Sequence, residues 1–187
     1  MHFAARNGHH TVAQLLINRG ANIEARNNDK NTPLFLAASK GHHSVVQILT
    51  DMGANVKAVE RDGFTALYAA ARKGHLECVR ILYERGAKVE AKDYRSLCPL
   101  HAAARHGHCS TVEFLVSKGA NIDAAANEGS TTLCFAVELE RLDVVKLLLK
   151  LGANPNLPDE GCTPLRWAVE RKNKEIEKLL RDGGAKN

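Results

Sequence analysis

The chain has 187 residues, of which 26 are basic and 21 acidic, so its formal net charge is +5, and 44% of its residues are apolar. This composition is typical of a globular protein and excludes a disordered or collagen-like chain. The longest aliphatic runs, such as residues 147–149, are far shorter than the roughly 20 residues that a membrane-spanning helix needs, so we expect no membrane insertion.

The first residues and the cysteines both favour an intracellular protein. Residues 1–6 lack a basic stretch followed by an apolar core, so we expect no signal peptide. The chain has five cysteines, an odd number, and it is long enough to bury a core without disulfide bonds. We therefore expect reduced thiols and a location in the cytoplasm or the nucleus.

Glycines recur at a fixed interval along the whole chain. Two sets repeat every 33 residues, and the first set is followed each time by histidine and the second by alanine. The Gly-His set is Gly8, Gly41, Gly74 and Gly107, and the Gly-Ala set is Gly20, Gly53, Gly86, Gly119 and Gly152. Such self-similarity predicts a solenoid of stacked units, in which each unit buries its apolar face against its neighbours.

In chain order, each unit is predicted to contain a turn and then a first helix. Asp62-Gly63 forms one such turn, and Thr65 is placed to accept hydrogen bonds from the free N–H groups at the start of the helix. In other units proline follows the threonine, as at Pro33 and Pro164, where its fixed φ suits the first helical position. Paired alanines, such as residues 102–103, would let neighbouring units approach closely.

A second helix is predicted to begin after each Gly-His pair. Apolar residues at helical spacing, such as Cys78, Val79, Ile81 and Leu82, indicate that this helix buries one face. The glycine of the Gly-Ala pair would end it, because glycine readily adopts the left-handed conformation that closes a helix. About ten residues of turn or extended chain then lead to the next threonine.

These intervals divide the chain into one array of about six units: residues 1–26, 27–59, 60–92, 93–125, 126–157 and 158–187. The first unit starts inside its first helix, so we expect further repeats upstream in a longer natural protein. In the last unit, Glu177 and Arg181 stand where the preceding unit has Val145 and Leu149. A terminal unit must expose the face that internal units bury, so the last unit is predicted to be a C-terminal cap.

The repeated residues resemble the ankyrin repeat. The family pattern appears most fully in residues 98–103, Cys-Pro-Leu-His-Ala-Ala, with Gly107-His108 and Gly119-Ala120 after it. The resemblance implies an all-α solenoid of 33-residue repeats, each a β-turn plus two antiparallel helices, stacked into a curved array with a concave binding face. The motif histidine is kept only at His2 and His101, so the hydrogen bonds that it makes between turns should be missing from several repeats. The other repeats carry Phe35, Tyr68, Cys134 and Arg166 at this position.

Histidine and cysteine also gather between residues 98 and 109, but their spacing does not match a zinc pattern. Cys98 occupies the threonine position of the repeat, His101 the motif histidine and His108 the Gly-His position, so three of the candidates already have structural explanations. The sequence shows no nucleophile elbow, phosphate-binding glycine loop or facing pair of carboxylates. We therefore expect no metal, no cofactor and no enzymatic activity.

The remaining candidate site is the binding surface that the resemblance implies. Variable residues of the family cluster at the turn tips and at two positions after the paired alanines. In this chain those helix positions would form a basic stripe. The tips would add aromatic and basic side chains, with Phe64 and Leu97 nearby as apolar anchors. The alternative is that the charged residues only solvate exposed helices. The predicted partner-binding residues are Lys40, Arg61, Phe64, Arg72, Lys73, Tyr94, Arg95, Leu97, Arg105 and His106.

These features predict a non-catalytic protein–protein interaction module, monomeric as an isolated array, whose partner offers an acidic or mixed acidic and apolar segment. A basic surface with a pI near 9.0 also fits nucleic-acid binding. That function is disfavoured because aromatic residues are not interleaved with the basic ones as single-strand binding requires. A third possibility is a spacer or self-associating scaffold within a larger protein.

Overall fold

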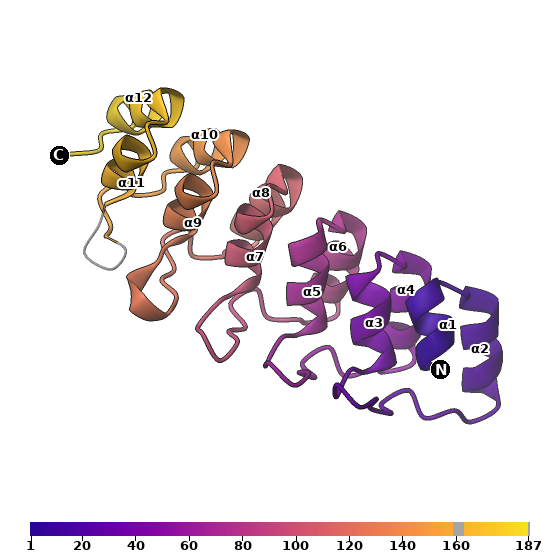
Figure 1. The fold of residues 1–187 in the computed structure, drawn as a ribbon. Helices are drawn as coiled ribbons and strands as arrows, with labels where there is room; N and C mark the ends of the chain where they lie inside the picture. The colour runs from indigo at the N-terminus through magenta and orange to yellow at the C-terminus, as the bar shows by residue number, and fades with distance from the viewer. Residues whose placement is uncertain (159–162, 187) are drawn as a thin grey trace.

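The computed structural model describes residues 1–158 and 163–186. Within them, helices follow one another in antiparallel pairs, and the pairs stack into one elongated array (Figure 1). We call the first helix of each pair inner and the second outer. The inner helices are α1 (His2–Asn7), α3 (Pro33–Ser39), α5 (Ala66–Lys73), α7 (Pro99–Arg105), α9 (Thr132–Glu138) and α11 (Pro164–Glu170). The outer helices are α2 (His10–Asn18), α4 (His43–Asp51), α6 (Leu76–Glu84), α8 (Cys109–Ser117), α10 (Leu142–Lys150) and α12 (Lys174–Asp182), and a 3-10 turn, η1, spans Asn127–Gly129.

The structure confirms the all-α solenoid that the sequence predicts. Inner helices pack on neighbouring inner helices and outer helices on neighbouring outer helices, so each pair is supported mainly by the pairs before and after it. In the described residues, extended pairing is limited to isolated bridges, such as Val59 with Thr65, in the turns between pairs. Asp159 and Glu160, where the repeat pattern predicts a turn tip, lie outside the described residues.

Sequence-encoded caps begin the inner helices. A threonine hydroxyl accepts a hydrogen bond from the backbone N–H three residues later in four repeats, as predicted for Thr65, and proline occupies the first helical position in α3, α7 and α11. The pairs and their oxygen–nitrogen distances are Thr32 and Phe35 (3.2 Å), Thr65 and Tyr68 (3.2 Å), Thr131 and Cys134 (3.3 Å), and Thr163 and Arg166 (3.3 Å).

One apolar core runs along the array between the two helix layers. The leucine two residues after each cap is buried, and so is the predicted apolar stripe of α6, which consists of Cys78, Val79, Ile81 and Leu82. Small alanines on the inner helices are fully buried between neighbouring pairs, which allows the close approach that the sequence predicts. The buried leucines of the inner helices are Leu34, Leu67, Leu100, Leu133 and Leu165.

Three histidines of the Gly-His pairs, His42, His75 and His108, lie against the glycine of the preceding pair. The ring of His108 donates through Nε2 to the backbone oxygen of Arg72 at 3.1 Å and lies against Gly74, where an added Cβ would stand 2.5 Å from Nδ1. His42 makes the same contacts with the Arg6 oxygen, at 3.0 Å, and with Gly8. Glycine is therefore required here for two reasons: its left-handed backbone and the space that the next histidine fills.

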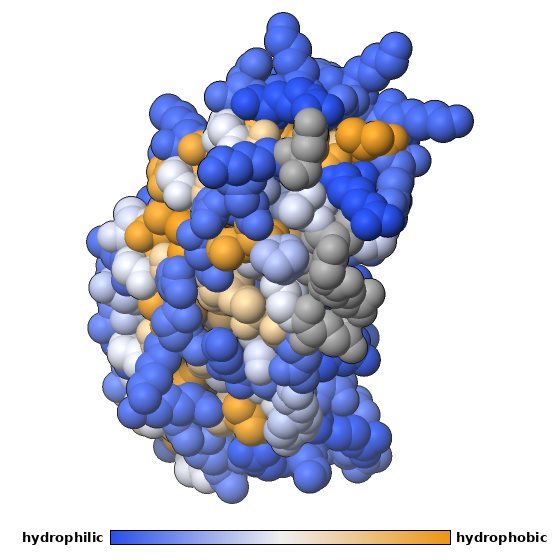
Figure 2. Space-filling view, turned by 90° about the vertical axis from the view of Figure 1, so that its left-hand side faces the viewer, coloured by the Kyte–Doolittle hydropathy of each residue, from blue (hydrophilic) through white to orange (hydrophobic). Residues whose placement is uncertain are grey.

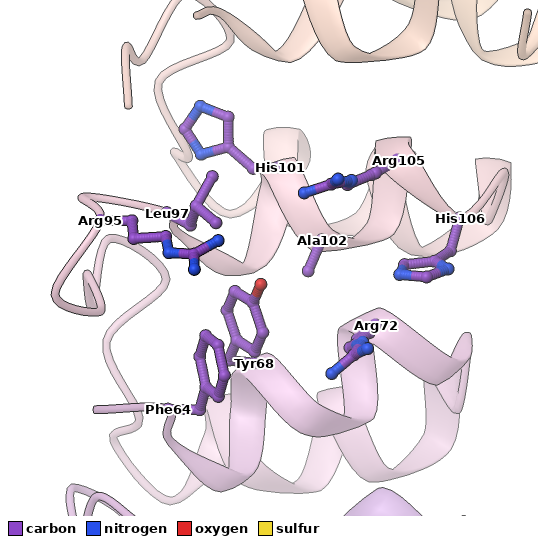
Figure 3. Close-up of a pocket in the computed structure, with 9 residues that line it drawn as sticks. All are labelled: Phe64, Tyr68, Arg72, Arg95, Leu97, His101, Ala102, Arg105 and His106. Atoms are coloured by element: carbon purple, nitrogen blue, oxygen red, sulfur yellow. The ribbon is translucent and has the colours of Figure 1, made fainter. Parts of the chain in front are cut away.

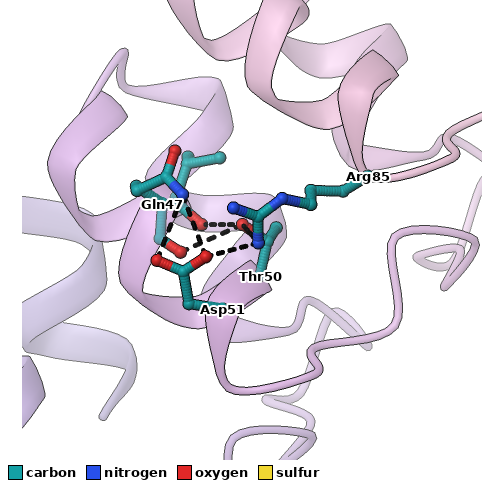
Figure 4. A network of polar contacts seen from close by, with 5 residues as sticks. Gln47, Thr50, Asp51 and Arg85 are labelled. Carbon is teal, nitrogen blue, oxygen red and sulfur yellow. Dashed lines mark hydrogen bonds and ion pairs between the residues drawn. The ribbon is translucent and has the colours of Figure 1, made fainter.

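Polar contacts join the outer helices too (Figure 4). Arg85, at the end of α6, forms an ion pair with Asp51 of α4 and lies within 3.5 Å of the Thr50 hydroxyl. Gln47 donates to both carboxylate oxygens of Asp51, at 3.0 and 3.1 Å. These hydrogen bonds from Gln47 and Arg85 lower the pKa of Asp51.

The motif histidines link successive turns, as the resemblance implies. His101 accepts a hydrogen bond at Nδ1 from the Cys98 N–H at 3.1 Å, which leaves Nε2 to donate to the Ala124 oxygen at 2.9 Å. The expected loss of this link elsewhere is only partial, because the Cys134 thiol donates a long bond of 3.8 Å to the Leu157 oxygen. Phe35 has no polar group for such a bond.

Burial of His101 makes the stability of the fold depend on pH. Desolvation lowers the pKa of His101 from 6.5 to about 4, so between these values the unfolded chain binds a proton that the folded chain does not. We expect the contribution of His101 to stability to be complete above pH 6.5 and to be lost as the pH falls toward 4. An NMR titration should find its ring neutral at pH 5, and protonation near pH 6.5 would contradict this assignment.

The two ends of the array differ in polarity. In α1 and α2, Phe3, Val12 and Leu15 are exposed, whereas in α12 Ile176 and Leu180 are buried and Glu177 pairs with Arg181 at 3.0 Å. Seen from the side of the C-terminus, the surface is mainly hydrophilic, with apolar residues in small separate patches (Figure 2).

Upstream repeats, the repeat boundaries and the capping role of the last unit stay predictions. Among the described residues, no helix has both the length and the apolar character to cross a bilayer.

Candidate functional site

A pocket of about 250 Å³ lies between α5 and α7, beside the turns that precede these helices. Its walls combine apolar side chains with cationic ones, and none of the lining residues is acidic (Figure 3). We call it the α5–α7 pocket. The lining residues are Phe64, Tyr68, Arg72, Arg95, Leu97, His101, Ala102, Arg105 and His106.

Aromatic and aliphatic side chains form one wall of the pocket. Phe64, in the turn before α5, stacks on Tyr68 of α5 with ring centroids 4.3 Å apart and planes inclined by 12°. Tyr68, Leu97 and Ala102 are buried together in a small cluster separate from the main core, and Phe64 packs against it. Burial also raises the pKa of Tyr68, so its hydroxyl keeps its proton near neutral pH.

Three guanidinium groups approach the pocket from different elements. Arg72 and Arg105 lie in the last turns of α5 and α7, and Arg95 lies in the turn before α7. Figure 3 shows Arg95 reaching over the aromatic pair on one side of the pocket, with Arg72 and Arg105 on the other side. All three are exposed, and among the described residues none forms an ion pair with a carboxylate.

The positive field of these residues acts on His106. Partial desolvation and the nearby charges of Arg72, His108, Arg105 and Lys73 lower its pKa, so the ring is neutral at pH 7. A cationic histidine is disfavoured here because the surrounding charge is already positive. The pocket is therefore suited to an anionic ligand.

A second pocket, of about 280 Å³, lies next to the first, between α7 and α9. Arg95, Leu97 and Arg105 line both pockets, and the guanidinium carbon of Arg105 is 5.5 Å from the ring centroid of Phe135. We call it the α7–α9 pocket. Its other lining residues are Ala126, Asn127, Ser130 and Phe135.

The structure brings together some of the residues that the sequence singles out and separates others. Phe64, Arg72, Arg95, Leu97, Arg105 and His106 share the α5–α7 pocket. Leu97 is only 7% exposed, because the apolar cluster covers its side chain. Its backbone N–H donates to the Asp93 carboxylate at 2.7 Å.

The other four predicted residues lie outside this pocket. Lys40 lines a separate pocket between α1 and α3, and the guanidinium of Arg61 donates to the Asn28 oxygen of the preceding turn at 3.0 Å. Tyr94 is 73% exposed at its turn tip, next to Gly63, and Lys73 is exposed on α5.

Sequence reasoning missed seven lining residues of the two pockets: Tyr68, His101, Ala102, Ala126, Asn127, Ser130 and Phe135. Four of them share a signal that could have identified them, because Tyr68 and His101 occupy the motif histidine position and Ala102 and Phe135 follow that position by one residue.

Histidine and cysteine side chains are the residue types that could ligate a metal ion in this chain. Within residues 1–158 and 163–186, no group of three or more His, Cys, Asp or Glu side chains is arranged to hold a metal ion. No disulfide bond joins any two of the described cysteines, Cys78, Cys98, Cys109 and Cys134.

Comparisons with known proteins agree with this architecture. The sequence pattern of ankyrin repeats, in three copies, matches residues 1–93 and 100–187. An ankyrin repeat domain from Acinetobacter baumannii AYE has a similar structure, with a TM-score of 0.88 and 34% identity, over 99% of this chain and 97% of that one. The human ASB11 ankyrin repeat domain gives a TM-score of 0.90 and 34% identity, over 99% of this chain and 83% of that one.

A curated relative matches over a shorter segment. The ankyrin repeat protein FPV022 of fowlpox virus (strain NVSL) is 50% identical over 50 residues, which are 26% of this chain. The match spans only 9% of the length of that viral protein.

Proposed function

The chain belongs to the ankyrin repeat family, whose domains are generally protein-interaction modules, and we propose that its inner helices and turn tips form a non-catalytic, concave binding surface for a partner protein. The docking segment of that partner is acidic, with an apolar residue beside the acidic ones. The observation that carries this proposal is the α5–α7 pocket, where an apolar wall lies beside three exposed arginines that have no carboxylate partner among the described residues.

Rigidity supports this function. The residues of the pocket belong to helices and turns that the stacked neighbours already hold in place, so little conformational freedom is lost when a partner docks. Arginine and tyrosine are also the side chains that most often dominate binding energy in protein interfaces. Exposed Tyr94 and the three arginines would supply such contacts.

Charge reversal tests the proposal. We expect a peptide selected by display from a random library to be acidic, and its association with the chain to slow markedly with salt, because screening weakens attraction between exposed charges. The variant carrying Arg72→Glu and Arg105→Glu should lose most of that salt dependence in stopped-flow measurements. Tyr94→Ala should instead speed dissociation. Unchanged kinetics in both variants, or selection of peptides without acidic residues, would move the binding site away from this surface.

Nucleic-acid binding is the weaker proposal. Single-strand binding uses exposed aromatic faces between cations, whereas Tyr68 is buried and Phe64 is half-buried beneath the arginines. A gel-shift assay at moderate salt should therefore show no stable complex. We further propose a monomeric array in the cytoplasm or the nucleus, and oligomers detected by light scattering would favour the alternative of a self-associating scaffold.

A further inference from the structure

We infer that the α5–α7 pocket binds a phosphoryl group, and that its ligand is a phosphorylated serine or threonine of the partner's docking segment. This inference rests on the proposed function, because it names the group that the same surface would hold. A phosphorylated residue differs from the carboxylates of a plain acidic segment in its larger negative charge and its greater number of acceptor oxygens.

The number and origin of the cations carry the argument. A carboxylate has two oxygens and is satisfied by a single arginine fork, whereas a phosphomonoester carries a charge of about −1.5 to −2 at pH 7 and three acceptor oxygens. Arg72, Arg95 and Arg105 come from three separate elements and all line the same pocket (Figure 3). A pocket lined by three arginines offers more forks than a carboxylate can use, and this suits the three oxygens of a phosphoryl group.

Among the described residues, no carboxylate forms an ion pair with these cations, although the charge of Asp93 acts on Tyr68 and His101. Arg85 pairs with Asp51, but none of the three pocket arginines has such a partner among the described residues. Asp93, which lies in the same turn as Arg95, accepts the backbone N–H groups of Arg95 and Leu97 at 2.9 and 2.7 Å, and it does not line the pocket. The positive charge is therefore available to a ligand.

The apolar wall strengthens electrostatic attraction in the pocket and supplies a hydrogen-bond donor. Tyr68, Leu97 and Ala102 are buried, so the inner side of the pocket is poorly solvated and electrostatic attraction there is less weakened than at an open surface. Figure 3 shows the Tyr68 hydroxyl pointing into the pocket, where it can donate a hydrogen bond to a phosphoryl oxygen.

The adjoining pocket extends the same site. Arg95 and Arg105 form part of the wall between the two pockets, and the α7–α9 pocket is lined by the half-buried ring of Phe135. A segment whose phosphorylated residue lies in the α5–α7 pocket would place a neighbouring apolar side chain in the α7–α9 pocket. This agrees with the mixed acidic and apolar docking segment of the proposed function.

Three labelled peptide libraries test the inference. Their central residue is fixed as phosphoserine, glutamate or serine, the flanking positions are degenerate, and binding to the full chain is measured by fluorescence anisotropy at about 0.15 M salt. We expect the phosphoserine library to bind at least about tenfold more tightly than the glutamate library, since each additional charge-assisted hydrogen bond contributes on that scale. The serine library should bind most weakly.

The outcomes separate the two proposals. Equal affinity for phosphoserine and glutamate, both above serine, would overturn the phosphoryl site and leave the acidic-segment proposal standing. Equal affinity for all three libraries, or no binding, would overturn both. A single-stranded oligonucleotide that binds more tightly than the phosphoserine library would overturn the choice of a protein partner.

Matched variants assign the preference to the pocket. Arg72→Gln, Arg95→Gln and Arg105→Gln each remove one exposed cation, so the chain should still fold, which thermal melts followed by circular dichroism would verify. Each should lose most of the preference for phosphoserine over glutamate. Arg19→Gln removes the same charge at the exposed end of α2 and should keep the preference. Equal losses in Arg19→Gln and the pocket variants would contradict a localised site.

Discussion

Replacing Leu82 by alanine should lower the free energy of unfolding by about 2–5 kcal/mol, the range for large-to-small changes in buried cores. Leu82 is fully buried in α6, and α6 packs against α4 and α8 as well as against its own partner α5. The cavity would therefore weaken contacts on both sides of the helix pair. Denaturant unfolding measures the total loss.

Hydrogen exchange would show where that loss falls. In a solenoid each pair is stabilised by its neighbours, so amides of α4 and α8 should lose protection along with those of α5 and α6. Leu15→Ala is the matched control, because Leu15 is 55% exposed and its truncation should have a small effect. A uniform loss of protection in every repeat after Leu82→Ala would contradict the nearest-neighbour organisation.

That organisation explains why the sequence predicts so much of the fold. Each helix start depends on residues within one repeat, such as Thr65 and its bond to the Tyr68 N–H, and each burial pattern depends on contacts that recur in every repeat. Local signals at a fixed period are therefore sufficient to place the helices and the core. No distant pairing has to be guessed.

The site is less predictable because it forms between repeats. Phe64 and Arg105 line one pocket although they are far apart in sequence, while Lys40, at the equivalent helix position of an earlier repeat, lines another. Sequence periodicity gives the face of a helix on which a side chain stands, and it does not give the direction in which a long side chain extends. Leu97 shows the same limit, since burial by Tyr68 and Ala102 follows only from their arrangement in space.

The reason for the Gly-His pairs also emerges only from the structure. The sequence indicates that Gly74 ends a helix, which its left-handed φ of 70° confirms. It does not indicate that the ring filling the space beside Gly74 belongs to His108, one repeat later, or that this ring binds the Arg72 oxygen. The glycine and the histidine of successive repeats are therefore a coupled pair.

This coupling can be measured with two glycines that differ only in their surroundings. Gly74→Ala should cost about 2–3 kcal/mol: about 1–2 kcal/mol for a left-handed alanine and about 1 kcal/mol for the displaced His108 hydrogen bond. Gly86 has a φ of 83° and nothing within 4 Å of an added Cβ. Gly86→Ala should therefore cost only the free energy of placing an alanine in the left-handed conformation. Urea unfolding of both variants gives the difference.

A double-mutant cycle then identifies the cause of that difference. If an added methyl group at position 74 acts by displacing His108, then in the background of His108→Ala the change Gly74→Ala should cost no more than Gly86→Ala. In the His108→Ala background the Cβ added at position 74 meets no ring, because the atoms nearest to it in the unsubstituted chain belong to His108. Equal costs for Gly74→Ala and Gly86→Ala in the unsubstituted chain would mean that the ring moves aside freely. The regular histidines would then contribute nothing to the coupling between repeats, and their spacing would need another physical explanation.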